Sequence, residues 1–219
     1  MREAWLIFVK DIRQEFKTRY AVNAILLFAI VTLSAVSFAI GTFSAGLEIL
    51  AALFWIILFF SSMSGLSHIF IREEEAQTAD TLKLVARPLH IYLGKFLFNL
   101  LLLFVLEIIL IPLFMGLMNF AVANLWLFIL IVGIGSFGLA GGGTIVAAII
   151  SKASTKGALF TVLAFPILLP VLITGISATK TVTQAAAIAE VQGELQALFA
   201  YGVVIITAGI LLFDYVWNE

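Results

Sequence analysis

The sequence predicts an all-α membrane protein with six transmembrane helices, an N-terminal interfacial helix and a cytoplasmic coupling helix between the second and third spans. Hydrophobic residues make up 63% of the 219 residues and charged residues only 11%. A soluble domain is about half apolar and about a quarter charged. Too little polar surface remains to cover a soluble domain of this size, so the lipid bilayer is the expected solvent.

Six apolar segments are long enough to cross a membrane, because a hydrocarbon core of about 30 Å needs about 20 residues of helix. Each segment is expected to be a helix, since lipid offers the backbone no other hydrogen-bonding partners. We expect one permease domain over residues 1–219. Its six spans are placed at about 21–40, 47–71, 91–118, 124–150, 157–179 and 195–217.

Residues 2–19 are expected to form an amphipathic helix that lies on the membrane surface. Apolar residues recur with the spacing of one helical face, at Trp5, Val9, Ile12 and Phe16. The opposite face carries Glu3, Lys10, Gln14 and Lys17. Such a helix suits the boundary between lipid headgroups and acyl chains; the alternative is an ordinary segment beside the first span.

The basic residues predict the orientation. With the N-terminus in the cytoplasm, every Lys and Arg except Lys180 falls in an inner segment or at a span end beside one. Cytoplasmic segments are those that carry the excess of Lys and Arg. We therefore expect both termini in the cytoplasm.

The segment 72–90 is a charged island between two apolar spans, so it must lie in water. Leu82, Val85 and Leu89 give it a short apolar face. Charged residues, Glu73, Glu74, Glu75 and Arg87, surround that face. This pattern predicts a short cytoplasmic helix on which a partner protein pushes.

The other connections are less informative. Segments 41–46 and 119–123 are short outer turns, and 151–156 is a short inner turn. The long outer segment 179–194 has apolar residues on one helical face, which predicts either a short amphipathic helix or a plain interfacial turn. Those residues are Ile188, Val191, Leu195 and Leu198.

Inside the predicted spans, Glu107 is the one acid far from water. A charge at the centre of a membrane helix costs about 2.5–3.5 kcal/mol on insertion scales, so this side chain is expected to face the bundle or a wet cavity. Two interpretations stay open: a role in transport or coupling, or a hydrogen bond to Ser, Thr or Asn on a neighbouring helix.

Glycine and proline mark two further spans as candidates for close packing or movement. Gly138 and Gly142 have the G-x-x-x-G spacing that lets membrane helices approach closely. Gly133–Gly138 also matches a dinucleotide fingerprint, but that motif needs a strand before it, and here it lies within one span. Pro166 and Pro170 disrupt the same face of the fifth span, as Pro112 does in the third. We expect the fifth span to be a moving part.

Several functions are excluded. A net charge of −1 gives no basic field to hold nucleic acid, and the absence of cysteine excludes disulfides and thiolate metal sites. No Walker A motif and no catalytic grouping occurs, so the chain is expected to be neither an ATPase nor another enzyme. His68 and His90 could ligate haem iron, but no spacing pairs them, and interfacial polar contacts are the favoured interpretation.

Two stretches resemble a known family. The first holds residues 70–75 (FIREEE), 81–82 (TL), 87–88 (RP) and 92–95 (YLGK); the second holds 138–152 (GLAGGGTIVAAIISK), Gly157 and 165–173 (FPILLPVLI). Together with the order of spans, they resemble the CcmB-type haem exporter permease of cytochrome c maturation, a permease of ABC-2 type. Asp80 precedes Thr81 where family members commonly have glycine.

The resemblance implies a subunit of an ATP-driven complex in the bacterial inner membrane, for haem export or for release of a haem-loaded chaperone. Its implied partners are an ABC ATPase subunit that binds ATP, a second copy of the permease, a haem-handling membrane protein and a haem chaperone. It also implies that residues 73–89 form the coupling helix, with contacts from Glu73, Glu74, Glu75, Thr81, Leu82, Val85, Arg87 and Pro88.

Two alternatives from other classes remain open. The chain could be an ABC-2 permease for another substrate, such as a lipid or a polysaccharide. It could instead be an intramembrane scaffold without transport, which would have no ATPase partner.

Overall fold

The computed structural model describes residues 1–40, 45–151, 156–184 and 187–218. All regular structure in these ranges is helical. The helices are α1 (Arg2–Thr18), α2 (Tyr20–Ile40), α3 (Leu47–Leu66), α4 (His68–Glu75), α5 (Ala79–Val85), α6 (Pro88–Met118), α7 (Leu125–Ser151), α8 (Lys156–Gln184), the 3₁₀ turn η1 (Ile188–Glu190) and α9 (Gln192–Asn218). Six of these are long and apolar enough to cross a membrane, with α3 and α4 counted together. The prediction of an all-helical chain with six such helices is confirmed.

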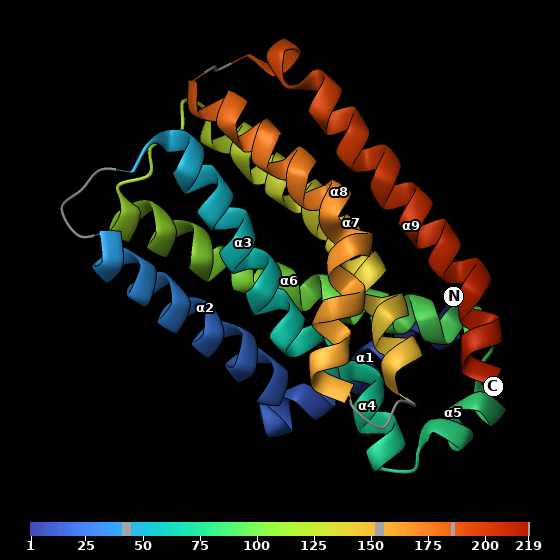
Figure 1. The fold of residues 1–219 in the computed structure, drawn as a ribbon. Helices are drawn as coiled ribbons and strands as arrows, with labels where there is room; N and C mark the ends of the chain where they lie inside the picture. Colours follow the sequence, from blue (N-terminus) through green and yellow to red (C-terminus); the bar gives the residue numbers. More distant parts are fainter. Residues whose placement is uncertain (41–44, 152–155, 185–186, 219) are drawn as a thin grey trace.

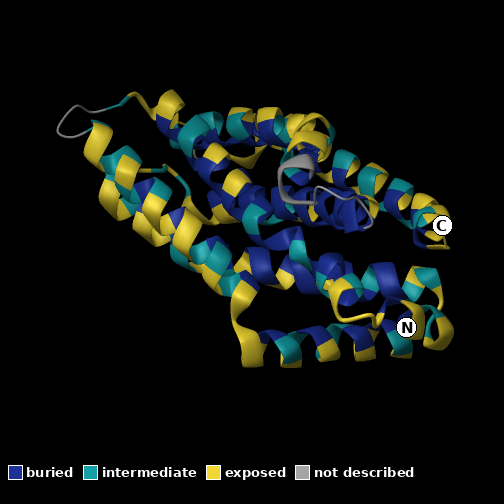
Figure 2. Ribbon diagram, turned by 60° about the horizontal axis from the view of Figure 1, so that its bottom comes forward, coloured by how far each residue is buried: buried dark blue, intermediate teal, exposed yellow. Residues whose placement is uncertain are grey.

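The long helices alternate in direction, so both termini lie at the same end of the bundle (Figure 1). That end also holds α1, α4 and α5, and we call it the α1 end. In Figure 2, α1 runs beneath the ends of the other helices before the chain turns into α2. α7 is central, with contacts to α6, α8, α9, α3 and α4. Within the apolar spans, 61% of α7 is buried but only 17% of α2 and of α9.

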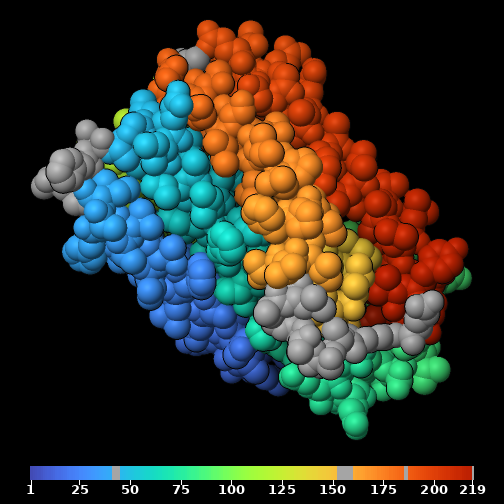
Figure 3. All heavy atoms as spheres, viewed as in Figure 1, coloured from blue at the N-terminus to red at the C-terminus, as the bar shows by residue number. Residues whose placement is uncertain are grey.

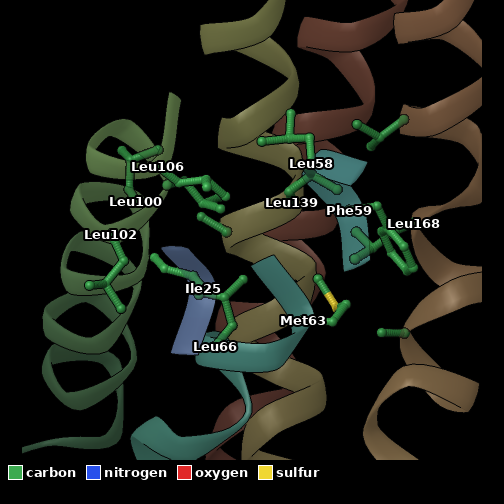
Figure 4. Packing of buried hydrophobic residues seen from close by; sticks show 14 of the residues in the cluster. Ile25, Leu58, Phe59, Met63, Leu66, Leu100, Leu102, Leu106, Leu139 and Leu168 are labelled. Carbon is green, nitrogen blue, oxygen red and sulfur yellow. The ribbon is translucent and has the colours of Figure 1, made fainter. Parts of the chain in front are cut away.

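Trp55 shows how glycine lets the central helices pack. Its indole lies against Gly135 of α7 and Gly175 of α8, where an added Cβ would overlap the ring. The indole N–H donates to the Thr179 hydroxyl at 2.8 Å. One aromatic side chain from α3 is therefore held by both neighbours. Figure 4 shows part of the apolar core of the bundle, in which Met63 of α3 lies near Leu139 of α7 and Leu168 of α8.

The predicted bounds differ from the observed ones at the charged segment. The second span is divided into α3, which ends at Leu66, and α4, which begins at His68; together they run to Glu75, past the predicted end at 71. α6 begins at Pro88 rather than at 91, which suits proline because the first helical residue needs no N–H partner. The expected single coupling helix is therefore two short helices, α4 and α5.

The outer segment 179–194 is also different. α8 continues to Gln184, and the expected amphipathic helix is reduced to η1 followed directly by α9. Val191 is buried and Ile188 is exposed. The Ala123 N–H donates to the Val182 carbonyl at 3.2 Å, which ties the end of α8 to the turn before α7. The turn interpretation is the one that matches. The predicted turns at 41–46 and 151–156 fall largely outside the described residues.

The prolines of α8 do not break it. The helix runs through Pro166 and Pro170, and the Tyr201 hydroxyl of α9 donates to the Ile167 carbonyl in the same turn. The carbonyls that the prolines leave without a helical N–H are those of Val162 and Pro166, four residues earlier, so this hydrogen bond links α9 to α8 without replacing a lost one.

The face of α1 that packs on the bundle lies beside the apolar face predicted for the membrane. The face that packs on the bundle carries Ala4, Ile7, Asp11 and Glu15, all buried. Trp5 and Phe16, from the predicted membrane face, are 59% and 75% exposed. α1 therefore has a half-polar face on the protein and an apolar edge beside it. That edge keeps it suited to the membrane boundary.

The close contact of α1 with α6 depends on Gly94. A Cβ at this position would lie 2.8 Å from the Ala4 carbonyl oxygen and 2.9 Å from the Ile7 side chain. Backbone atoms of a packed helix cannot yield cheaply to such an overlap. Glycine is therefore required here by space, not by backbone conformation.

We expect Gly94→Ala to destabilise the protein by about 1–3 kcal/mol, the usual cost of overpacking. The control is Gly116→Ala in the same helix, where no atom lies within 4 Å of an added Cβ. Without a clash, that change gains up to about 1 kcal/mol of helix propensity. Thermal unfolding in detergent compares them, and equal effects at both positions would contradict the packing of α1 on Gly94.

Candidate functional site at the α1 end

The α4–α5 segment, residues 68–86, protrudes from the α1 end (Figure 3). α4 ends at Glu75, and Gln77 has a left-handed backbone with φ of 53° that reverses the chain into α5. The turn is held by Thr78, whose N–H donates to the Glu73 carbonyl at 2.9 Å and whose hydroxyl donates to the Glu73 carboxylate at 2.6 Å. The turn is therefore built on Glu73.

Glu73 belongs to a cluster of four charges on three helices, in which Asp11, Glu73 and Lys95 are buried and Lys10 is exposed. The Lys95 ammonium of α6 is 1% exposed, and it lies 2.6 Å from Glu73 of α4 and 3.1 Å from Asp11 of α1. It also donates to the Ile69 carbonyl at 3.3 Å. Lys10 of α1 donates to the same oxygen of Glu73. One ammonium thus joins α1, α4 and α6.

The pairing is what makes this burial tolerable. An ion taken out of water costs several kcal/mol unless opposite charges and hydrogen bonds compensate. Two ammonium groups, Lys10 and Lys95, face two carboxylates, Asp11 and Glu73, so the cluster is neutral overall. Burial disfavours the charge of Lys10, but the neighbouring carboxylates outweigh it and raise the pKa of Lys10.

One further ion pair and one hydrogen bond tie α1 to the segments on either side of α5. Arg72 of α4 lies 3.1 Å from Glu15, whose other oxygen accepts the Val22 N–H at 3.0 Å. At the start of α1, Glu3 lies 2.7 Å from His90 of α6. The hydrogen bond with His90 lowers the pKa of Glu3. α1 is therefore bound to α4 and α6 along its whole length.

The outer surface of the segment is apolar at its tip. Leu84 and Val85 of α5 are 88% and 66% exposed, and Leu89 at the start of α6 is also exposed. Leu82 points the other way and is buried with Ala79. Lys83 lies over the ring of Trp217 near the end of α9, 5.7 Å from its centroid. α5 therefore rests on the bundle with one face and offers Leu84 and Val85 to a partner.

The predicted coupling residues differ in how far they are buried. Glu75, Thr81, Val85 and Arg87 are exposed, while Glu74 and Pro88 are partly buried. Glu73 and Leu82 differ from the prediction, because both are buried within this chain. Glu73 turns inward because Lys95 needs a carboxylate there. It cannot be a rim contact, and its role is to hold the segment on α6.

The other predicted candidates lie in the bundle interior, away from this segment. Glu107 accepts a hydrogen bond from Ser136, so the interhelical bond considered from the sequence is present. Asn99 donates to Thr144 at 2.9 Å in the same α6–α7 contact. An added Cβ at Gly138 or Gly142 would crowd α8, at Val171 and Leu168 respectively. These glycines are packing positions for α8, the helix that contains both Pro166 and Pro170.

Neither histidine is placed to act with the other. His68 of α4 has its ring against Tyr20, and His90 of α6 pairs with Glu3. Across the described residues, no group of three or more His, Cys, Asp or Glu is arranged to hold a metal ion.

Sequence reasoning missed Lys95 and Asp11 as site residues. Lys95 belongs to the YLGK stretch, and Asp11 is one of the three acids of α1, with Glu3 and Glu15. A lysine four residues into an otherwise apolar span was the available signal. Its partner could not be read from spacing, because Asp11 lies 84 residues away.

Comparison with models of protein families matches residues 2–214 to the family described as CcmB protein. The match includes α1, the α4–α5 segment and nearly all of the last helix. No curated protein matches the chain.

Proposed function

This chain belongs to the CcmB family, and from that premise we propose that its α4–α5 segment is the surface on which the partner ATPase docks. As a family member, it is the permease subunit of a haem exporter in cytochrome c maturation and not an enzyme. It is a multi-pass protein of the inner membrane that works with an ABC transporter ATPase. Haem is therefore the substrate handled by the complex, and ATP is bound by the partner subunit.

Exposure supports the docking surface. Leu84 and Val85 form an apolar tip on a segment that protrudes beyond the bundle, and Glu75 and Arg87 supply charge around it. Apolar centres with charged rims are typical of specific protein interfaces. This surface lies at the end that holds both termini, and the basic residues favour the cytoplasm for that end.

The buried cluster supports a route by which docking moves the bundle. A push on α5 acts through the turn at Thr78 on Glu73, and Glu73 is bonded to Lys95 of α6. α1 follows through Asp11 and through the pair of Glu15 with Arg72. ATP-driven closure of the partner subunits would thereby shift α1, α4 and α6 together.

In the interior, we place the transport path along α6, α7 and α8. Glu107 is the candidate polar group on this path, and Gly138, Gly142, Pro166 and Pro170 are the candidate points of bending. A buried carboxylate in a span is by default a functional candidate. Its bond to Ser136 joins α6 to α7, so movement of α6 would alter its surroundings.

The family resemblance also supports an assembly larger than one permease and one ATPase. We propose two copies of each, together with a haem-handling membrane protein and a haem chaperone. The complex either passes haem through the permease or drives release of the haem-loaded chaperone.

A single cysteine tests the docking surface, because the chain has none of its own. We expect Leu84→Cys to form a cross-link to the ATPase, and to react with a membrane-impermeant maleimide only after cells are opened. The control is Ile188→Cys, which is 63% exposed at the opposite end of the bundle. It should react in intact spheroplasts and form no cross-link. Labelling of Leu84→Cys from outside would reverse the proposed orientation.

Replacements of Glu107 test the transport path. Glu107→Gln keeps an oxygen for the Ser136 hydroxyl but removes the acid, so the hydrogen bond and the fold should persist. If the carboxylate serves transport, cytochrome c maturation should fall by about tenfold, equivalent to about 1.4 kcal/mol. The matched control is Ser136→Ala, which keeps the carboxylate and should keep maturation. Full maturation with Glu107→Gln would reduce Glu107 to a packing role.

A further inference from the structure

A groove beside the elbow between α1 and α2 is separate from the docking surface. It has a volume of about 300 Å³ and lies where α1, α2 and α6 meet. Phe98 and Leu102 of α6 form its buried floor. The remaining lining residues are Ile12, Glu15, Phe16, Arg19, Val22, Leu101 and Val105.

The groove is apolar except at its rim, and the rim carries one net positive charge. Glu15 is neutralised by Arg72 at 3.1 Å and by the Val22 N–H. Arg19 is exposed, and no ion pair joins it to an acid in the described part of the chain. Its backbone has φ of 52°, which places it at the turn between the two helices. A guanidinium without a partner therefore stands over an apolar slot.

The position of the elbow matches the headgroup layer of a membrane. Tyr20 follows Arg19 directly at the start of α2, and Trp5 lies on α1; both are exposed. Exposed Trp and Tyr gather at the membrane–water boundary. Phe16, on the wall of the groove, is also exposed, so the groove opens sideways where acyl chains begin.

We propose that this groove binds an anionic phospholipid, with its phosphate on Arg19 and one acyl chain along Phe98 and Leu102. Arginine pairs with phosphate in two parallel hydrogen bonds, and the floor gives the chain an apolar surface. The lipid would brace the elbow against α6. This inference does not depend on docking at the α4–α5 segment.

Two other occupants match the groove less well. An apolar helix of another protein would cover the floor but would give the Arg19 guanidinium no anion. Haem also carries negative charge on an apolar body, but the lining has no His, Met, Cys or Tyr to ligate its iron. A phospholipid supplies an acyl chain for the floor and an anion for Arg19, and it needs no iron ligand.

The test is native mass spectrometry of the purified complex, equilibrated with bilayers of phosphatidylcholine containing a minor share of phosphatidylglycerol. We expect the wild-type complex to retain phosphatidylglycerol preferentially. Arg19→Gln should reduce that preference by about fivefold, the effect of one cation near the lipid surface. Arg13→Gln is the matched control, since Arg13 is an exposed cation on α1 that does not line the groove.

A second variant, Val105→Trp, fills the groove with a larger side chain and keeps Arg19. Val105→Trp should lower retention of both lipids, while thermal unfolding shows whether the fold is intact. Unchanged lipid preference in Arg19→Gln, or an equal loss in Arg13→Gln, would overturn the proposal. The proposal would also be overturned if the wild-type groove held haem or a second permease copy instead of lipid, and Val105→Trp released that occupant.

Discussion

The arrangement of the α1 end depends on one buried ammonium group. Lys95 sits at the cytoplasm-favoured end of α6, almost without exposure, between carboxylates from α1 and α4. A buried ammonium group costs several kcal/mol unless opposite charges lie close to it. Without Glu73 of α4, two ammonium groups would face the single carboxylate of Asp11, so the charges favour the packing of α4 against α1 and α6.

This constraint explains why the charged segment is not simply a loop. The Glu73 carboxylate accepts hydrogen bonds from Lys95, Lys10 and Thr78. These bonds hold the turn that leads into α5. α5 can then bury Leu82 and expose Leu84. The proposed ATPase surface and the proposed path into the bundle are thus two sides of the same short segment. A flexible loop could move without moving α6, but a segment bonded to α6 through Glu73 and Lys95 would move α6 with it.

The sequence predicted what lipid enforces and missed what distant residues decide. The six long helices followed from apolar length, because a backbone in lipid has no other hydrogen-bonding choice. The packed face of α1 was not predicted, because it carries Asp11 and Glu15, which only their partners on α6 and α4 make suitable for burial. Glu73 was assigned to the surface for the same reason. The outer amphipathic helix failed because α8 continues past the expected end, whereas the hydrogen bond of Glu107 to a serine followed from the cost of an unpaired acid in lipid.

A double-mutant cycle between Glu73 and Lys95 tests most directly whether this pair joins the α4–α5 segment to α6. The variants are Glu73→Gln, Lys95→Met and both together, with unfolding free energies measured in the assembled complex. Each single change leaves a buried group without its partner, so we expect the double variant to lose less than the sum, with a coupling energy of about 1–3 kcal/mol. Additive losses, within about 0.5 kcal/mol, would mean that the two residues do not act as a pair and would contradict the proposed clamp.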